Sequence, residues 1–490
     1  YQISGQLIDG PTIVVSPLIA LQRDQVEALN ARIPGQAGEA NSTVSVAELR
    51  ERFAAYERGD LEYLFLAPEQ LVREETIERL RGARPSLFVV DEAHCISAWG
   101  HDFRPEYLRL GAVVEELGRP TVLALTATAA PPVRAEICER LHLRDPEVVV
   151  RGFDRPNIRL SVKRFVEEDD KVRSLIECVG TSEGSGIVYV ATRKRTQEIA
   201  HAFIEQGVIA VPYHAGLPPK SREVVHQQFM ADDVQVVVAT IAFGMGIDKP
   251  DVRFVHHLDI SDSLDSYYQE LGRAGRDGQP AEATLFFRQE DLGVRRFFAG
   301  GSGLERDRLV LLHKAIELGG PDLAVRELAD ELQLSEGMVR VALHRLADAG
   351  CIEMRPGDRV SVAEHDDLGA AIDAAVRAHE VEQQVEQSRV EMMRSYAEGT
   401  QCRRAMLLTY FGEPFDPPCG NCDNCEAGRS ETADETSPFS AGSRVIHTAW
   451  GAGSVVRTEG DQLVVLFDDR GYKTLSIELV VEGDLLKTAG

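Results

Sequence analysis

The sequence predicts a multidomain α/β protein in which two parallel-sheet lobes precede smaller helical and all-β domains. Apolar strands and amphipathic helices alternate through residues 1–152, and the same rhythm returns through residues 153–300. After residue 304 the pattern changes to short helices, a hairpin and finally short strands separated by turn residues. A chain of 490 residues is long enough for three or more such domains.

In both predicted lobes, short apolar runs alternate with segments of helical periodicity. This order predicts parallel sheets covered by helices on both faces, and two consecutive lobes form a cleft suited to a nucleotide. In the first lobe we expect strands at Thr12–Ser16, Tyr63–Ala67, Leu87–Val90 and Thr121–Leu125, with helices at Leu18–Leu29 and Val46–Arg58. In the second lobe we expect strands at Gly186–Val190, Val234–Ala239, Phe254–Leu258 and Ala283–Phe287.

Further domains are predicted downstream of the two lobes. Residues 304–363 contain a helix, a short turn, a second helix and a hairpin, which together predict a winged helix. Residues 364–426 predict a helical module that ends in a cysteine cluster, and residues 427–441 are polar enough to form a linker. Residues 442–490 contain four short strands separated by turn signals, so we expect a small SH3-like β-barrel.

Composition restricts the class of protein. No apolar run approaches the length of a membrane span and no signal peptide is visible, so we expect a cytoplasmic protein without a membrane partner. The net charge of −26 argues against nucleic acid binding over the whole surface, although a local basic groove can lie within an acidic chain. Four of the eight cysteines cluster, which favours one metal site over a disulfide framework.

The most informative segment runs from Asp91 to Tyr107. Asp91 and Glu92 follow an apolar strand, the place where a nucleotide-hydrolysing α/β protein holds Mg²⁺ and orients the attacking water. The rest of the segment contains Trp, Phe, Tyr and Arg side chains, which are suited to stacking on bases. The sequence therefore predicts ATP hydrolysis coupled to nucleic acid.

One expected motif does not occur in the sequence, the Gly-rich phosphate loop that ends in Gly-Lys-Ser/Thr. The chain starts at Tyr1-Gln2, inside what looks like the helix after such a loop. We therefore expect further residues before Tyr1 in the natural protein. If none precede it, the alternative is a non-catalytic DNA-binding scaffold.

Taken together, these motifs resemble those of RecQ-type helicases of superfamily 2, over nearly all of residues 1–300. The resemblance rests on seven segments: Val15–Ile19, Ala67–Glu69, Asp91–Tyr107, Leu125–Ala129, Tyr213–Leu217, Ala239–Pro250 and Gln269–Gly278. It implies two RecA-like lobes and an ATP-dependent DNA helicase that moves 3′→5′ on single-stranded DNA. It also implies a monomer associated with the nucleoid, which unwinds forked or tailed duplexes in DNA repair and recombination. A DNA-stimulated translocase that does not unwind duplexes is the alternative.

The resemblance also assigns roles in the first lobe. Asp91 would hold Mg²⁺, Glu92 would polarise the attacking water, and His94 would sense the γ-phosphate. Thr126 and Thr128 follow a strand, so their hydroxyls can bond across the cleft to the acidic motif or simply form a turn.

For DNA, the aromatic-rich loop supplies the first candidates. Trp99 and Phe103 would stack on or sense single-stranded DNA, and Arg104 would link the DNA to the nucleotide site. Phe103 and Tyr107 could instead be ordinary core aromatic residues. Ser16 and Pro17 would contact DNA phosphates through hydroxyl and backbone N–H groups, and Thr128 is a further DNA-binding candidate.

In the second lobe, the spacing of Arg273 and Arg276 places both on one face of a predicted helix. Arg276 would act as the arginine finger that stabilises charge on the γ-phosphate, with Arg273 beside it. Gln269 would bridge the nucleotide and the lobe interface, and Gly246 would allow close backbone approach to the nucleotide. Asp248 would contact the ribose or the finger, at a position where the family usually has Asn.

The cysteine cluster has the spacing of a structural zinc site. Cys402 begins a predicted helix, Arg403–Phe411, and the other three ligands would be Cys419, Cys422 and Cys425. The resemblance implies a zinc module directly after the second lobe, whereas here the winged-helix pattern comes first. In that pattern Arg340, His344 and Arg345 could meet DNA phosphates, but nearby acidic residues leave a protein-packing role equally open. We expect the acidic C-terminal barrel to dock a protein partner.

Overall fold

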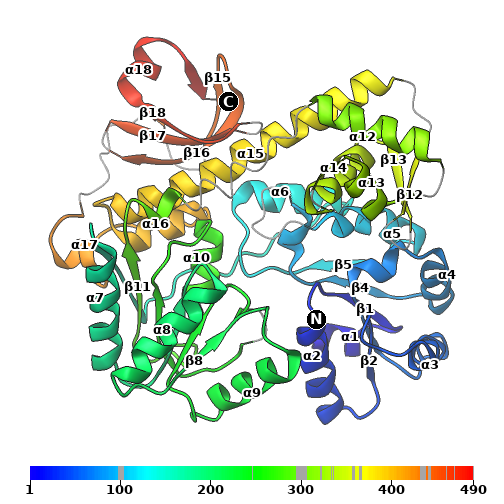
Figure 1. Cartoon of the computed structure of the whole chain (residues 1–490), viewed down its shortest axis with the longest axis horizontal. Coiled ribbons are helices and arrows are strands. Elements are labelled where there is room, and N and C mark those ends of the chain that lie inside the picture. The colour runs from blue at the N-terminus through cyan, green and yellow to red at the C-terminus, as the bar shows by residue number, and fades with distance from the viewer. Residues whose placement is uncertain are drawn as a thin grey trace. The chain divides into compact units, whose positions relative to one another are not determined.

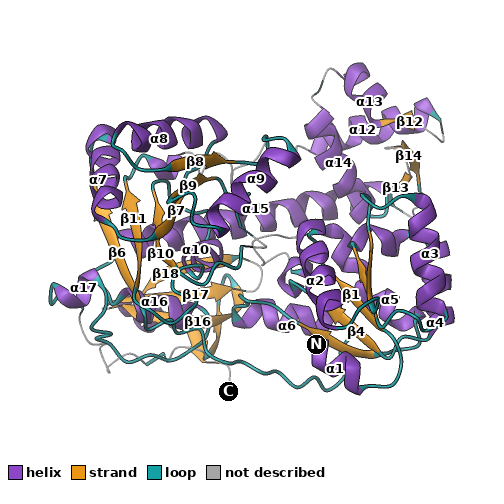
Figure 2. Ribbon diagram, turned by 90° about the horizontal axis from the view of Figure 1, so that it is seen from below, coloured by secondary structure: helices purple, strands orange, loops and turns teal. Residues whose placement is uncertain are grey.

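The computed structural model describes residues 1–97, 104–244, 247–293, 306–320, 323–332, 334, 336–355, 359–363, 367–430, 438–439, 443–459, 461–467 and 470–488. The chain divides into two compact units. The first unit comprises Tyr1–Asp291, Met393–Gly442 and Val456–Gly460, and the second comprises Leu292–Met392, Ser443–Val455 and Asp461–Gly490. The elements are labelled in Figures 1 and 2.

The first lobe is built on a parallel five-stranded sheet of order β2-β3-β1-β4-β5. The continuous apolar runs of β1, β3 and β4 are fully buried, as expected for strands covered on both faces. The strands are β1 (Thr12–Val15), β2 (Ala37–Ala40), β3 (Tyr63–Leu66), β4 (Leu87–Val90) and β5 (Thr121–Ala124). The helices are α1 (Gln2–Leu7), α2 (Ile19–Arg32), α3 (Val46–Glu57), α4 (Glu74–Ala83), α5 (Leu110–Glu116) and α6 (Pro131–Arg140), with 3₁₀ turns η1 (Pro68–Val72), η2 (Ala93–Ile96) and η3 (Pro105–Arg109).

The second lobe repeats this design with a parallel six-stranded sheet of order β6-β11-β10-β7-β9-β8. Helices α7 and α8 cover one face of the sheet, and α10 and α16 lie on the other (Figure 2). The strands are β6 (Ile158–Arg164), β7 (Ser185–Tyr189), β8 (Ala210–Tyr213), β9 (Val236–Ala239), β10 (Val252–His257) and β11 (Ala281–Phe287). The helices are α7 (Glu168–Thr181), α8 (Arg193–Glu205), α9 (Pro219–Met230) and α10 (Leu264–Leu271).

The C-terminal half begins with three helices that share one apolar core and a small antiparallel sheet of order β12-β14-β13. The first of the two helices predicted within residues 304–363 corresponds to α13, and the residue Leu323 before it pairs with Val360 as a strand. The turn of the predicted hairpin lies outside the described residues. The elements are α12 (Arg306–Gly319), β12 (Leu323–Ala324), α13 (Val325–Leu332), α14 (Glu336–Asp348), β13 (Ile352–Arg355) and β14 (Arg359–Val362).

The remaining elements are three helices followed by an antiparallel sheet of order β18-β17-β16-β15-β19. The helices are α15 (Leu368–Glu398), α16 (Arg403–Tyr410) and α17 (Asp423–Glu426). The sheet is formed by β15 (Arg444–His447), β16 (Gly451–Glu459), β17 (Gln462–Phe467), β18 (Gly471–Ser476) and β19 (Leu486–Thr488), with α18 (Ile477–Glu482) before its last strand.

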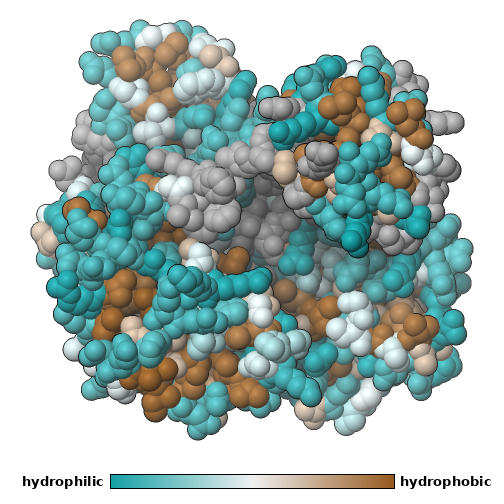
Figure 3. All heavy atoms as spheres, viewed as in Figure 1, coloured by the Kyte–Doolittle hydropathy of each residue, from teal (hydrophilic) through white to brown (hydrophobic). Residues whose placement is uncertain are grey.

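The surface is of mixed polarity. Apolar side chains on the face shown in Figure 3 are interspersed with hydrophilic ones. Within the described ranges, no helix combines the length and the apolar character that crossing a membrane would require.

Candidate functional site

The acidic pair lies at the carboxyl end of β4, where the strand gives way to η2. Ser16 donates a hydroxyl hydrogen bond to the Asp91 carboxylate at 3.3 Å, and Tyr107 donates to the Asp91 carbonyl at 3.2 Å. Burial, followed by repulsion from Glu92, raises the pKa of Asp91 to about 6. A divalent cation would offset both effects, and oxygen donors are the ligands that Mg²⁺ prefers. Asp91 therefore fits the predicted role.

His94 connects the acidic pair to the loop after β5. Its buried ring places Nδ1 2.9 Å from the Thr126 hydroxyl and 3.2 Å from the Glu92 carboxylate. Thr126 in turn donates to the Thr128 carbonyl at 3.0 Å. The expected hydrogen bond between the threonine hydroxyls and the acidic motif is thus present at Thr126.

Thr128 makes a contact from the first lobe to the second. Gln269, on α10, donates to the Thr128 hydroxyl at 3.1 Å. This hydrogen bond joins the two lobes, and the predicted contact of Gln269 with the nucleotide stays a prediction. Thr128 is buried, so its hydroxyl is directed at Gln269 in this conformation, and its contact with DNA stays a prediction.

Ser16, another DNA-binding candidate, donates within the first lobe. Its hydroxyl donates to Asp91 and its backbone N–H to the Leu66 carbonyl, because Ser16 directly follows the buried strand β1. Its contact with DNA phosphates stays a prediction. Arg104 donates to the Pro17 carbonyl at 3.2 Å, which places these two candidates together. Trp99 and Phe103 lie outside the described residues.

Arg273 and Arg276 were predicted to share one face of a helix, and this prediction is wrong. Helix α10 ends at Leu271, so Arg273 and Arg276 lie in the turn that follows. Gly275, in the left-handed region with φ +55°, takes the chain away from the helical path. Arg273 is buried, whereas Arg276 is partly exposed and forms an ion pair with Asp248. Asp248 thus contacts Arg276, while the finger role of Arg276 and a contact of Asp248 with the ribose stay predictions. Gly246 lies outside the described residues.

Several of the side chains described above line one cavity of about 790 Å³. Glu92 and Thr128 line it from the first lobe, and Gln269, Arg273 and Arg276 line it from the second. A carboxylate therefore faces two guanidinium groups across a space of the size that small-molecule sites have. The opposed charges can orient a water on one side and stabilise phosphate charge on the other.

The sequence analysis missed Arg155, which also lines this cavity. Its guanidinium donates to the carbonyls of Gly272, Ala274 and Gly275 at 2.7–3.0 Å. These partners are 117 to 120 residues away in the chain, so no local spacing could have indicated them.

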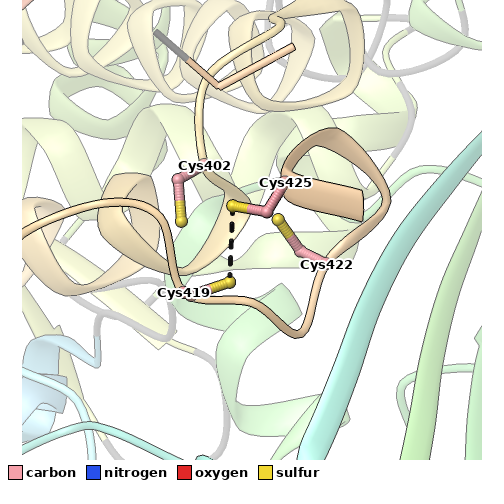
Figure 4. A group of neighbouring side chains, drawn as sticks. All are labelled: Cys402, Cys419, Cys422 and Cys425. Atoms are coloured by element: carbon pink, nitrogen blue, oxygen red, sulfur yellow. Dashed lines mark hydrogen bonds between the residues drawn. The ribbon is translucent and has the colours of Figure 1, made fainter. Parts of the chain in front are cut away.

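The four clustered cysteines converge as the spacing predicted. Figure 4 shows Cys402, Cys419, Cys422 and Cys425 with their sulfur atoms directed toward one another, and all four lie within 4.8 Å of one another. Cys402 caps α16 by accepting from the Ala405 N–H at 3.5 Å. The hydrogen bond between Cys402 and Cys422 lowers the pKa of the Cys422 thiol and raises that of the Cys402 thiol, so the two sulfurs share one proton while no metal is bound. Four converging cysteine sulfurs fit a closed tetrahedral zinc site.

Three parts of the chain match known protein domains. Residues 2–136 match the DEAD/DEAH box helicase domain, residues 170–278 the helicase conserved C-terminal domain, and residues 363–426 the RecQ zinc-binding domain. The chain is 33% identical over 431 residues to the probable ATP-dependent DNA helicase RecS of Bacillus subtilis, covering 87% of this chain and 83% of that protein. The chain belongs to the RecQ family of helicases.

Two other RecQ-family relatives are longer than this chain. The ATP-dependent DNA helicase RecQ of Pasteurella multocida is 36% identical over 87% of this chain and 55% of its own length. The RecQ of Bacillus subtilis is 35% identical over 88% of this chain and 60% of its own length. The chain thus spans little more than half the length of these two relatives. The match to the RecQ zinc-binding domain contains α15, α16, α17 and all four cysteines, which confirms the predicted zinc-binding module.

Proposed function

We propose that this protein is an ATP-dependent DNA helicase of the RecQ type. The observation that carries the proposal is the cavity with Glu92 on one side and Arg273 and Arg276 on the other. The names of the relatives, which are ATP-dependent DNA helicases, support the same activity. Movement would be 3′→5′ on single-stranded DNA, with unwinding of forked or tailed duplexes in repair and recombination.

In this mechanism the residues of the chain position ATP and water. Asp91 would hold the Mg²⁺ that accompanies ATP, and that ion would supply positive charge to neutralise the phosphates. Glu92 orients the attacking water. Arg276 first leaves its ion pair with Asp248 and then stabilises the charge that develops on the γ-phosphate. The chain from Gln269 through Thr128 and Thr126 to His94 then connects the nucleotide state with the contact between the lobes.

The downstream domains complete the proposal. Residues 304–363 form a winged helix, a proposal supported by their three helices and small antiparallel sheet. Residues 442–490 form an SH3-like barrel, a proposal supported by the antiparallel order of the last five strands. The barrel docks a protein partner, and the enzyme acts as a monomer. Trp99, Phe103 and Arg104 contact single-stranded DNA.

The test is ATP hydrolysis by the full-length protein with and without single-stranded DNA. We expect DNA to stimulate hydrolysis and Glu92→Gln to reduce kcat by about 10²-fold or more, because an amide cannot activate water. Glu106→Gln is the matched control, since Glu106 is exposed in η3 and does not line the cavity. Hydrolysis that ignores both DNA and Glu92→Gln would contradict the proposal.

A second candidate is a DNA-stimulated translocase that does not separate strands. It is favoured by the position of α12 to β14, which precede the zinc-binding match along the chain. A labelled fork substrate distinguishes the two functions. Strand release during ATP hydrolysis supports the helicase, and hydrolysis without release supports the translocase.

A further inference from the structure

Residues 154–158 join the two lobes, and from here on "the linker" means this segment. It is held on one side by the zinc module. Arg404, buried on α16, donates to the carbonyls of Arg155 at 3.1 Å and Ile158 at 2.8 Å. Its Nε lies 3.2 Å from the Asp154 carboxylate. Asn421, between two of the cysteines, donates to the Pro156 carbonyl at 2.9 Å. The module therefore binds the Asp154 carboxylate and the backbone carbonyls of Arg155, Pro156 and Ile158.

The same segment holds the turn after α10 on its other side. Arg155 donates to Gly272 at 2.8 Å, to Ala274 at 2.7 Å and to Gly275 at 3.0 Å, in each case to the carbonyl oxygen. Asn157 donates to the carbonyls of Gly275 and Gln279, both at 2.8 Å. A planar guanidinium donates in fixed directions, so these bonds set the position of the turn as well as its distance.

That turn, residues 272–278, carries the two arginines of the cavity. Its packing against the linker is close, because a Cβ on Gly275 would lie 2.4 Å from Asn157 Nδ2. Within the second lobe, the backbone that carries Arg273 and Arg276 can therefore shift only if the contacts of Arg155 and Asn157 change. Misplacing a catalytic group by about 1 Å can cost about 10²-fold in rate.

We propose that Arg155 is a positioning residue for ATP hydrolysis, and that the zinc module sets its position through Arg404. This inference rests on the proposed function, because it assigns Arg273 and Arg276 to the nucleotide. The zinc module then contributes to hydrolysis through the linker, although its cysteines do not line the cavity.

The experiment compares three arginine variants of the full-length protein. Arg155→Gln removes the bonds to the turn, and Arg404→Gln removes the bonds to the linker. Arg159→Gln is the matched control, because Arg159 also joins the second lobe to the zinc module, through Glu426 at 2.6 and 2.9 Å, but does not contact the turn. Amide hydrogen exchange reports on residues 272–278, and kcat and KM for ATP report on the site.

We expect Arg155→Gln and Arg404→Gln to speed exchange in residues 272–278 and to lower kcat about tenfold or more, with KM for ATP changed far less. Zinc content and exchange in the buried strand β7 should stay at the level of Arg159→Gln. Arg155→Lys should behave like Arg155→Gln, because one ammonium cannot reproduce a fork that binds three carbonyls. Full activity in Arg155→Lys would show that only charge matters and would overturn the proposal.

The outcomes separate the two proposals. Unchanged exchange and unchanged kcat in both Arg155→Gln and Arg404→Gln overturn this inference while leaving the proposed function intact. A wild-type protein that does not hydrolyse ATP refutes the proposed function, and the exchange of residues 272–278 still tests the link from Arg404 to the turn. If Arg155→Gln fails to fold, Arg404→Gln tests the same link, because the hydrogen bonds and the ion pair that the structure gives Arg404 all go to residues 154–158.

Discussion

His256 is a buried base within the sheet of the second lobe. Its ring lies on β10, 4.9 Å from the ring of Phe254 and 5.8 Å from that of Phe286, with the Cys178 sulfur 3.6 Å from Nε2. Burial, with smaller effects from His257 and Lys163, lowers the pKa of His256 to about 3. The imidazole therefore stays neutral in the folded protein at pH values where an unfolded chain would protonate it.

This shift predicts acid sensitivity. Between pH of about 6.5 and 3 the unfolded state binds a proton that the folded state does not, so stability rises with pH across that window. At pH 5 we expect His256 to reduce the free energy of unfolding by about 2 kcal/mol relative to pH 7.5. His256→Phe should remove this part of the decrease in the free energy of unfolding at pH 5, measured by urea unfolding at both pH values. His201→Phe, on the exposed face of α8, should leave the decrease unchanged. An identical decrease in His256→Phe and wild type would contradict the prediction.

Single residues were predictable from the sequence where their neighbours in the chain define the chemistry. Asp91 and Glu92 follow an apolar run that can only be a buried strand, and the spacing of the cysteines indicates one metal. Arg155 was not predictable, because its three acceptors are backbone carbonyls more than a hundred residues away. Backbone acceptors leave no pattern in the sequence.

The turn after α10 shows how an element positions the site. Gly275 and Gly278 both adopt positive φ, +55° and +79°, so alanine is strained at either position. Only Gly275 is also packed, with Asn157 Nδ2 2.4 Å and the Gln279 carbonyl 2.8 Å from the place of a Cβ, whereas nothing lies within 4 Å at Gly278. The two glycines therefore separate backbone strain from packing.

Gly275→Ala should lower stability more than Gly278→Ala. We expect about 1 kcal/mol for Gly278→Ala from strain alone, and about 2 kcal/mol or more for Gly275→Ala because the linker must also shift. Gly275→Ala should in addition lower kcat for ATP, since it displaces Arg273 and Arg276. Urea unfolding and ATP hydrolysis measure the two effects. Equal losses in both variants would show that packing against Asn157 does not matter.

Elements were predictable where their composition is typical of one structure. The apolar runs of β1, β3 and β4 were found, whereas β2 was missed because Ala-Gly-Glu-Ala has neither alternation nor β-branched residues. β2 is a strand because it pairs along the edge of β3. The helix expected to carry Arg273 and Arg276 failed for a related reason, since tertiary contacts with the linker determine where α10 gives way to the turn.

At the scale of the whole first unit, the segment of the cysteine cluster also joins the zinc module to the second lobe. Cys422 forms an isolated bridge with Leu160 of β6, and Leu160 donates its N–H to the Asn421 carbonyl at 3.3 Å. Asp423 accepts from the Val162 N–H at 3.1 Å and from Arg403 at 3.0 Å. The segment that would surround zinc is thus an extension of the sheet edge at β6.

Removing zinc should therefore loosen β6 as well as the module. We expect a chelator, or Cys422→Ser, to lower the thermal midpoint of unfolding and to speed amide exchange in β6. The metal binds only the folded site, so its binding free energy contributes to the free energy of folding. Exchange in β1 should not change, since β1 lies inside the sheet of the first lobe between β3 and β4. Cys138→Ser is the matched control, because Cys138 is an isolated thiol on α6 outside the cluster. Protection of β6 that survives complete loss of zinc would mean that Arg403, Asp423 and Arg159 hold the module on the lobe without the metal.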